Sequence, residues 1–130
     1  MRAFSRRGFF ALLASAVGAT GLWLFRGERR SAIVSELDSV LEPDASTTMI
    51  GQQYLRRVPD EADQVRLREL ILSGFGRDPL FEGNVRILIR EAVKQDFAED
   101  RMVRLGQWML SQTEARLCAL TVLAHRDRPQ

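Results

Sequence analysis

The sequence has only one cysteine and one histidine among its 130 residues. With Cys118 alone, an intramolecular disulfide is excluded, so the fold must be held together by packing. The sequence also lacks a Cys-x-x-Cys-His motif for covalent haem and a cluster of histidines and cysteines for zinc. Gly74-Phe75-Gly76 lacks the further glycine of a dinucleotide-binding loop. We therefore expect no cofactor and no metal, and the composition disfavours an enzyme acting alone.

A strong excess of one charge is also missing. The chain carries 19 basic and 17 acidic residues. Four of the basic residues, Arg2, Arg6, Arg7 and Arg26, lie in the first 26 positions, so 15 remain against 17 acids, a net charge of −2 for the rest of the chain. A nucleic-acid-binding domain needs a basic face. The sequence therefore predicts no nucleic-acid partner.

The N-terminal residues have the layout of an export signal. Arg2, Arg6 and Arg7 form a cationic head, residues 8–25 carry no charge, and charge returns at residues 26–30. A helix over the apolar segment would be roughly 27 Å long, close to the hydrocarbon thickness of a bilayer. Residues 8–25 are therefore predicted to enter the membrane, either as a cleaved signal or as an uncleaved signal anchor.

This segment resembles the twin-arginine export signal on Ser5, Arg6, Arg7 and Phe9, with Phe10 where that family often has leucine. The resemblance implies a bacterial or archaeal protein that crosses the membrane already folded, through the twin-arginine translocase. It also implies a location in the periplasm or on the outer face of the cytoplasmic membrane, where an uncleaved signal would anchor the protein. An ordinary membrane helix or a general secretory signal is the alternative.

The rest of the chain is long enough for one small domain. The sequence divides into a signal or signal-anchor helix at residues 1–26, a linker of basic and acidic residues at 27–30, a helical domain at 31–126 and a disordered tail at 127–130. Apolar residues recur at helical spacing over the domain. The predicted fold is therefore mainly α, with an N-terminal signal helix followed by a small bundle of four to five helices.

Capping residues and prolines predict where the helices begin and end. The expected helices run from Ser31 to Pro43, from about Ala45 to Arg57, from a cap at Asp60 to Gly74, and onward from Gly83-Asn84. The residues expected to face the core are Ile33, Val34, Leu37, Val40, Leu41, Met49, Ile50, Tyr54, Val58, Ala62, Val65, Leu70, Ile71 or Leu72, Val85, Leu88, Ile89, Ala92, Val93 and Phe97.

A short hairpin near residues 102–110, or an extended arm, is predicted, because apolar and polar residues alternate there around a turn at Gly106. Ser111 followed by Glu114 is the pattern of a capping box, which predicts that the last helix begins at this point. That helix contains a nearly continuous apolar run from Leu117 to Ala124. We expect this run to lie at the centre of the bundle.

Residues 96–116 resemble a recurring tail of small, uncharacterised exported bacterial proteins. The shared pattern is an Asp-Phe pair, an arginine, a Gly-x-Trp turn and a Ser-x-Thr-Glu-Ala-Arg helix start. The resemblance implies a compact unit and no particular chemistry. The candidate ligand or partner site in this stretch consists of Asp96, Arg101, Trp108, Glu114 and Arg116. Alternatively, Trp108 packs against the last helix and Glu114 only caps it.

The leading functional hypothesis is a non-catalytic accessory subunit of a larger exported enzyme, plausibly a redox enzyme. In layout the chain is similar to the twin-arginine-targeted small subunit of membrane gluconate dehydrogenases, which has a signal followed by a helical body. A docking surface is expected at Phe75, Leu80 and Phe81.

Two other hypotheses remain open. The first is a free-standing envelope protein that binds a small ligand or peptide through residues 96–116. The second is an enzyme that uses the carboxylates and arginines of that stretch, which would require a pocket with a strongly perturbed acid.

Overall fold

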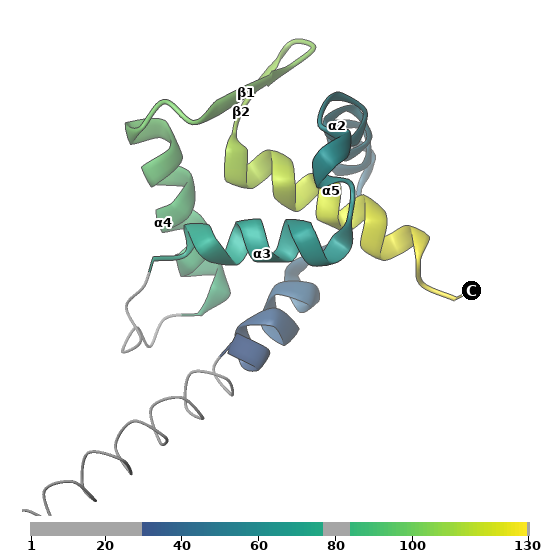
Figure 1. The fold of residues 1–130 in the computed structure, drawn as a ribbon, viewed down its shortest axis with the longest axis vertical. Coiled ribbons are helices and arrows are strands. Elements are labelled where there is room, and N and C mark those ends of the chain that lie inside the picture. The colour runs from purple at the N-terminus through teal and green to yellow at the C-terminus, as the bar shows by residue number, and fades with distance from the viewer. Residues whose placement is uncertain (1–29, 77–83, 130) are drawn as a thin grey trace, which may run out of the picture. The chain divides into compact units, whose positions relative to one another are not determined.

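The computed structural model of the protein describes residues 30–76 and 84–129 (Figure 1). The chain divides into two compact units, residues 1–34 and residues 35–130, and the second unit carries the fold described below. The predicted signal lies outside the described residues, as do Leu80 and Phe81. Over the described ranges, no helix has the length and apolar character needed to cross a membrane.

Helices make up most of the described chain. Residues 30–40 are helical. The later elements are α2 (Ala45–Arg57), the 3₁₀ turn η1 (Pro59–Glu61), α3 (Gln64–Gly74), α4 (Val85–Ala98), β1 (Met102–Leu105), β2 (Trp108–Ser111) and α5 (Gln112–Arg126). The prediction of a mainly α body with a short hairpin is confirmed for the residues that the structure describes.

A side chain caps the N-terminus of each helix from α2 to α5. The caps are Asp44 for α2, Asp63 for α3, Asn84 for α4 and Ser111 for α5, and each accepts a hydrogen bond from the backbone N–H three residues later. The predicted cap at Asp60 is wrong. Residues 59–61 form η1 instead, and α3 begins only after Asp63.

The buried face of α3 differs from the predicted one. Leu67 and Ile71, one helical turn apart, are buried. Val65, predicted to face the core, is 62% exposed, and Ala62 is exposed as well. Because residues two positions apart lie about 200° apart around a helix, burial of Leu67 turns Val65 toward solvent.

Two more residues expected in the core are exposed. Met49 lies on the outer side of α2, and Phe97 near the end of α4 is 53% exposed. The buried line of α4 consists of Val85, Ala92 and Asp96. Near the C-terminus of α4, the buried position is therefore Asp96 and not the predicted Phe97. A carboxylate faces the core where a phenyl ring was expected.

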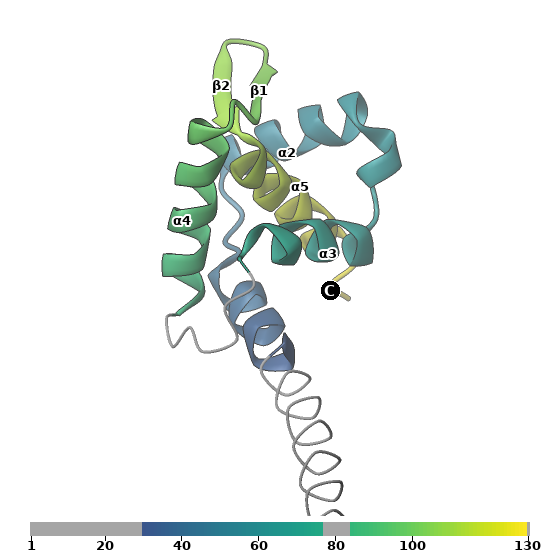
Figure 2. The same ribbon diagram turned by 60° about the vertical axis from the view of Figure 1, so that its left-hand side comes forward.

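Helix α5 forms the centre of the bundle, and α2, α3, α4 and the hairpin all pack on it. Figure 2 shows α5 between α2, α3 and α4. Its apolar run is buried at Ala119, Leu120, Val122 and Leu123. This confirms the prediction that the stretch from Leu117 to Ala124 lies at the centre.

The hairpin joins α4 to α5. Strands β1 and β2 are antiparallel, with Leu105 opposite Trp108 and Met102 opposite Ser111. The two-residue loop begins at Gly106, whose φ of +59° lies in the left-handed region that glycine adopts without strain. The predicted hairpin is confirmed, and Figures 1 and 2 show it projecting from the helices.

Candidate functional site

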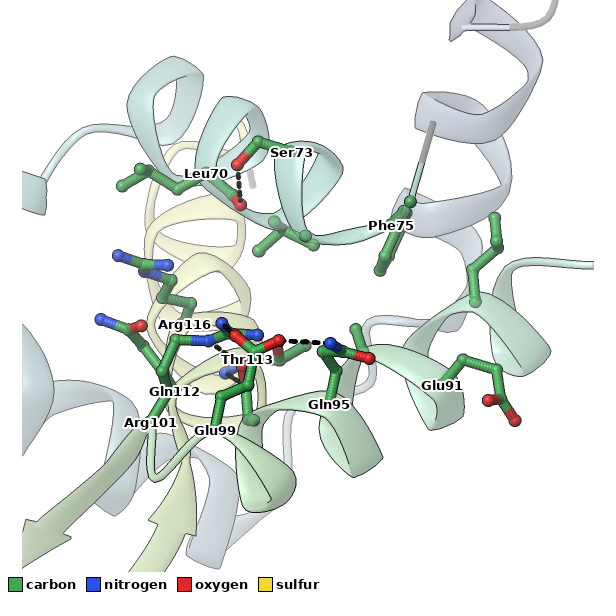
Figure 3. Close-up of a pocket in the computed structure, with 16 residues that line it drawn as sticks. Leu70, Ser73, Phe75, Glu91, Gln95, Glu99, Arg101, Gln112, Thr113 and Arg116 are labelled. Carbon is green, nitrogen blue, oxygen red and sulfur yellow. Dashed lines mark hydrogen bonds and ion pairs between the residues drawn. The ribbon is translucent and has the colours of Figure 1, made fainter. Parts of the chain in front are cut away.

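A cleft of about 690 Å³ opens between α3, α4 and α5 (Figure 3). Small-molecule sites have volumes of roughly 300–1,000 Å³. The apolar wall of the cleft consists of Leu70, Ile71, Phe75, Leu88 and Ala92. The polar end consists of Gln95, Asp96, Glu99, Arg101, Gln112, Thr113 and Arg116. An apolar wall facing a few polar groups is the usual composition of a binding site.

The C-terminus of α4 brings the first polar residues together. Asp100 adopts a positive φ of +56°, which reverses the chain directly after the helix. The backbone N–H of Arg101 then donates to the carbonyl oxygen of Asp96 at 2.8 Å, as in a Schellman motif. This local reversal places the side chain of Arg101 beside that of Asp96.

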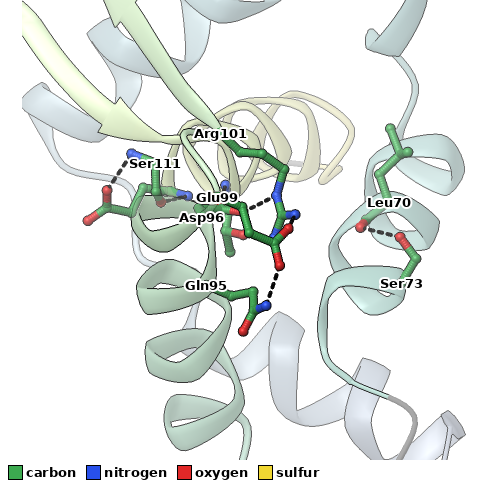
Figure 4. A network of polar contacts seen from close by, with 9 residues as sticks. Leu70, Ser73, Gln95, Asp96, Glu99, Arg101 and Ser111 are labelled. Carbon is green, nitrogen blue, oxygen red and sulfur yellow. Dashed lines mark hydrogen bonds and ion pairs between the residues drawn. The ribbon is translucent and has the colours of Figure 1, made fainter.

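Asp96 is buried and links the end of α4 to Arg101 in the turn after it and to the start of α5. Its Oδ1 accepts a hydrogen bond from Nε of Arg101 at 2.9 Å (Figure 4). Its Oδ2 accepts one from the backbone N–H of Thr113 at 2.7 Å. Burial by itself raises the pKa of Asp96, but the hydrogen bonds from Thr113 and Arg101 outweigh it, so the pKa lies below its ordinary value. The carboxylate is therefore ionised and fully engaged at neutral pH.

Glu99 completes this cluster at the cleft. It accepts hydrogen bonds from Arg101 Nη1 and from the side-chain amide of Gln95. Arg101 therefore bridges two carboxylates, one buried and one exposed. The carbonyl oxygen of Arg101 also accepts a hydrogen bond from the backbone N–H of Gln112 at 3.0 Å, which fixes the start of α5.

Arg116 enters the cleft from α5 and is held from behind by Glu61 of η1. Its Nε and Nη2 donate to the two carboxylate oxygens of Glu61 at 3.0 and 2.8 Å. The hydroxyl of Tyr54 donates to Glu61 Oε2 at 2.6 Å. The hydrogen bond from Arg116 is the main cause that lowers the pKa of Glu61. Burial and the neighbouring carboxylate raise the pKa of Tyr54 to about 12.

The structure brings together only part of the predicted site. Asp96, Arg101 and Arg116 all line the cleft. Glu114 instead forms the predicted capping box, in which it and Ser111 bind each other's backbone N–H groups. Trp108 is 39% exposed on the hairpin and is not among the cleft residues.

Of the docking surface expected at Phe75, Leu80 and Phe81, the structure describes only Phe75. Phe75 is only 8% exposed and belongs to the apolar wall of the cleft. Leu80 and Phe81 lie outside the described residues. Phe75 therefore offers an inner wall for a ligand rather than an outer strip for a partner protein.

Sequence reasoning missed several residues of the site. Glu61 and Tyr54 were not expected near Arg116, because the contact joins positions 55 residues apart along the chain. The only local signal was a tyrosine on the apolar face of α2, whose hydroxyl needs a partner when it is buried. Gln112 was also missed, since nothing in the sequence distinguishes it from a solvated first-turn residue.

The pKa shifts of Asp96 and Arg116 do not favour acid–base catalysis by these two groups at neutral pH. The pKa of Asp96 is lowered, while the pKa of Arg116 is raised by Glu61 against the opposing effect of burial. Each shift moves the group further from neutrality, whereas a general acid or base needs a pKa near the working pH. Burial raises the pKa of Cys118 to about 11, so its thiol is protonated and unreactive.

Within residues 30–76 and 84–129, no three histidine, cysteine, aspartate or glutamate residues are grouped so that they could hold a metal ion. Comparison with protein-family models, with curated proteins and with solved structures gave no match for this chain.

Proposed function

We propose that this protein is an exported, non-catalytic binding protein whose cleft between α3, α4 and α5 takes a small ligand or a peptide segment. The observation that supports this most is the combination of an apolar wall with three of the five predicted site residues, Asp96, Arg101 and Arg116, at one cleft. The hydrogen bonds of the polar end hold these side chains in place before a ligand arrives. Such pre-organisation reduces the entropy cost of binding.

Native mass spectrometry of the full-length protein, purified from the membranes of its producing cells, tests this proposal. We expect an additional mass bound to the wild type. Leu88→Arg places a charge in the apolar wall and should remove that mass. Gly74→Leu should do the same, because it adds a large side chain at a residue that lines the cleft and whose Cβ would meet no atom of the described residues within 4 Å.

The matched control is Val65→Arg, which adds the same charge to an exposed position of α3 away from the cleft. It should keep the bound mass. Thermal melting followed by circular dichroism would show that all variants are folded. A ligand mass retained in both cleft variants, or absent from the wild type, would contradict the proposal.

The accessory-subunit hypothesis is kept as a second candidate, and the hairpin is the feature that favours it. Trp108 and Met109 are 39% and 58% exposed on an element that projects from the bundle (Figure 2). Exposed tryptophan and methionine are enriched at protein interfaces. The partner would be a larger exported enzyme, and the contact would be made by the hairpin instead of Phe75.

An affinity pull-down of the tagged protein from solubilised membranes tests this second candidate. The expected result is one large exported enzyme in near-equal amount, lost in the double variant Trp108→Ser, Met109→Ser. The control is Gln107→Ser, which changes the same turn without removing an apolar side chain. Recovery of the protein alone would exclude the subunit hypothesis.

A further inference from the structure

The hydrogen-bonding groups that remain unused at the polar end of the cleft indicate the chemistry of its ligand. The side-chain amide of Gln112 lines the cleft, is half-buried, and makes no hydrogen bond with the residues that the structure describes. Figure 3 shows Gln112 and Arg116 next to each other, both carried by α5. Gln112 therefore presents a carbonyl oxygen acceptor and an amide group with two N–H donors to a ligand.

The two arginines have donors to spare as well. Arg116 uses Nε and Nη2 on Glu61, which leaves Nη1, and Arg101 uses Nε and Nη1 on its two carboxylates, which leaves Nη2. The oxygen of the Gln95 amide is a further acceptor, because only its nitrogen is engaged with Glu99. A ligand here meets both donors and acceptors.

The charges at this end disfavour a ligand that carries a negative charge of its own. Asp96, Glu99 and Glu61 surround Arg101 and Arg116, so the five groups carry three negative charges and two positive ones. Neither arginine is left as an unneutralised cation that would attract a carboxylate. An incoming anion would also approach the carboxylate of Glu99.

We infer that the cleft binds an uncharged peptide segment, with its backbone amide at Gln112 and Arg116 and an apolar side chain against Leu70 and Phe75. A backbone amide supplies both a donor and an acceptor without a charge, which matches the groups left free at the polar end. The apolar wall on α3 and α4 provides the surface for a side chain such as leucine. This inference rests on the proposed binding function and specifies its ligand class.

The test compares two probes that differ in one charge. N-acetyl-leucinamide carries the neutral amide pair, and N-acetyl-leucine replaces the terminal amide with a carboxylate. Each is titrated into the full-length, ¹⁵N-labelled chain in lipid nanodiscs, and resonance shifts of cleft residues are followed by NMR. We expect the neutral probe to bind about five- to tenfold more tightly than the anion, with shifts at the side-chain amide of Gln112.

Gln112→Ala should weaken binding of the neutral probe by about three- to tenfold, because it removes the side-chain amide that is free to hydrogen-bond the probe. The control is Gln52→Ala, an exposed glutamine of α2 away from the cleft, which should bind like the wild type.

Equal or tighter binding of the carboxylate probe, or unchanged binding in Gln112→Ala, would overturn the peptide assignment while leaving the cleft as a binding site. Absence of shifts with either probe would also overturn the assignment. The proposed function itself fails only if native mass spectrometry finds no ligand mass that depends on Leu88 and Gly74, so the two failures are distinguishable.

Discussion

Gly51 of α2 lies directly against the backbone of Cys118 in α5. A Cβ built on Gly51 would stand 2.3 Å from the carbonyl oxygen of Cys118 and 2.6 Å from a methyl carbon of Val122. A contact that short with backbone cannot be relieved by rotating a side chain. The two helices therefore cross as closely as they do because residue 51 has no side chain.

Gly51→Ala is expected to destabilise the protein by about 1–3 kcal/mol, because the helices must move apart and lose packing along their contact. Urea unfolding of the full-length chain measures the loss. Gly74→Ala is the control, since a Cβ there meets no atom of residues 30–76 and 84–129 within 4 Å. That variant should be neutral or up to about 1 kcal/mol more stable. Equal stability of Gly51→Ala and the wild type would mean that α2 and α5 are further apart than described.

The buried carboxylate of Asp96 predicts loss of stability in acid. Its pKa in the folded protein lies below the ordinary value of 3.8, so its stabilising contribution is complete above that value and is lost as the pH falls through the lower folded pKa. The pKa of Glu61 is likewise lowered from its ordinary value of 4.5, so the stabilising contribution of Glu61 is also lost as the pH falls. Melting temperatures measured from about pH 6 to about pH 2.5 should therefore fall steeply at the acid end.

Asp96→Asn should flatten this acid dependence and cost about 1–3 kcal/mol at neutral pH, because the charge-assisted hydrogen bonds from Arg101 and Thr113 are weakened. Asp60→Asn, at an exposed carboxylate of η1, provides the control. The same steep fall in Asp96→Asn as in the wild type would show that other groups cause the acid sensitivity.

Tyr54 is the only tyrosine in the chain, so its titration can be followed without interference. The structure predicts a phenol pKa of about 12, and the unfolded chain should titrate near the ordinary value of 10. The neutral phenol therefore stabilises the fold up to about pH 10, and this contribution is lost as the pH rises toward 12. Ultraviolet absorbance of the phenolate gives the measurement.

Glu61→Gln should lower the pKa of Tyr54, because it removes the neighbouring charge while burial remains. It should also destabilise the protein by about 1–3 kcal/mol, since Arg116 loses its partner. Glu69→Gln, at an exposed position of α3, should change neither quantity. A wild-type pKa near 10 in the folded protein would contradict the contact between Tyr54 and Glu61.

The predicted export route can be tested on its own. Replacing Arg6 and Arg7 with lysine keeps the charge but removes the arginine pair that the twin-arginine resemblance requires. We expect the protein to accumulate in the cytoplasm, as measured by cell fractionation and immunoblotting. Arg2→Lys lies outside the pair and should be exported normally. Unchanged export of the double variant would favour a general secretory signal.

Local signals predicted the helices and the hairpin well. Residues 45–57 became α2, the Asn84 cap starts α4, and Gly106 turns the hairpin. The error at α3 arose because Asp60 and Asp63 are both acceptable caps in sequence. Pro59 starts the separate turn η1, so α3 begins only after Asp63, and Leu67 is buried instead of Val65.

The site could be predicted only where its contacts are short-range. Asp96 and Arg101 are five residues apart and were both among the predicted residues. Glu61 reaches Arg116 across 55 positions, which requires knowledge of how η1 packs on α5. The burial of Asp96 could not be predicted either, because the apolar periodicity favoured Phe97 at the buried position. The hydrogen bond between the Asp96 carboxylate and the start of α5 leaves no signal in the sequence.

The segment between α4 and α5 is closed at its base by three hydrogen bonds. Arg101 N–H binds the carbonyl of Asp96, Gln112 N–H binds the carbonyl of Arg101, and Thr113 N–H binds the Asp96 carboxylate. The hairpin of residues 102–111 therefore leaves the bundle and returns to it at one hydrogen-bonded junction. The two-residue tip at Gly106 lies outside the cleft lining, so an epitope or a fluorescent reporter inserted there should leave the cleft intact.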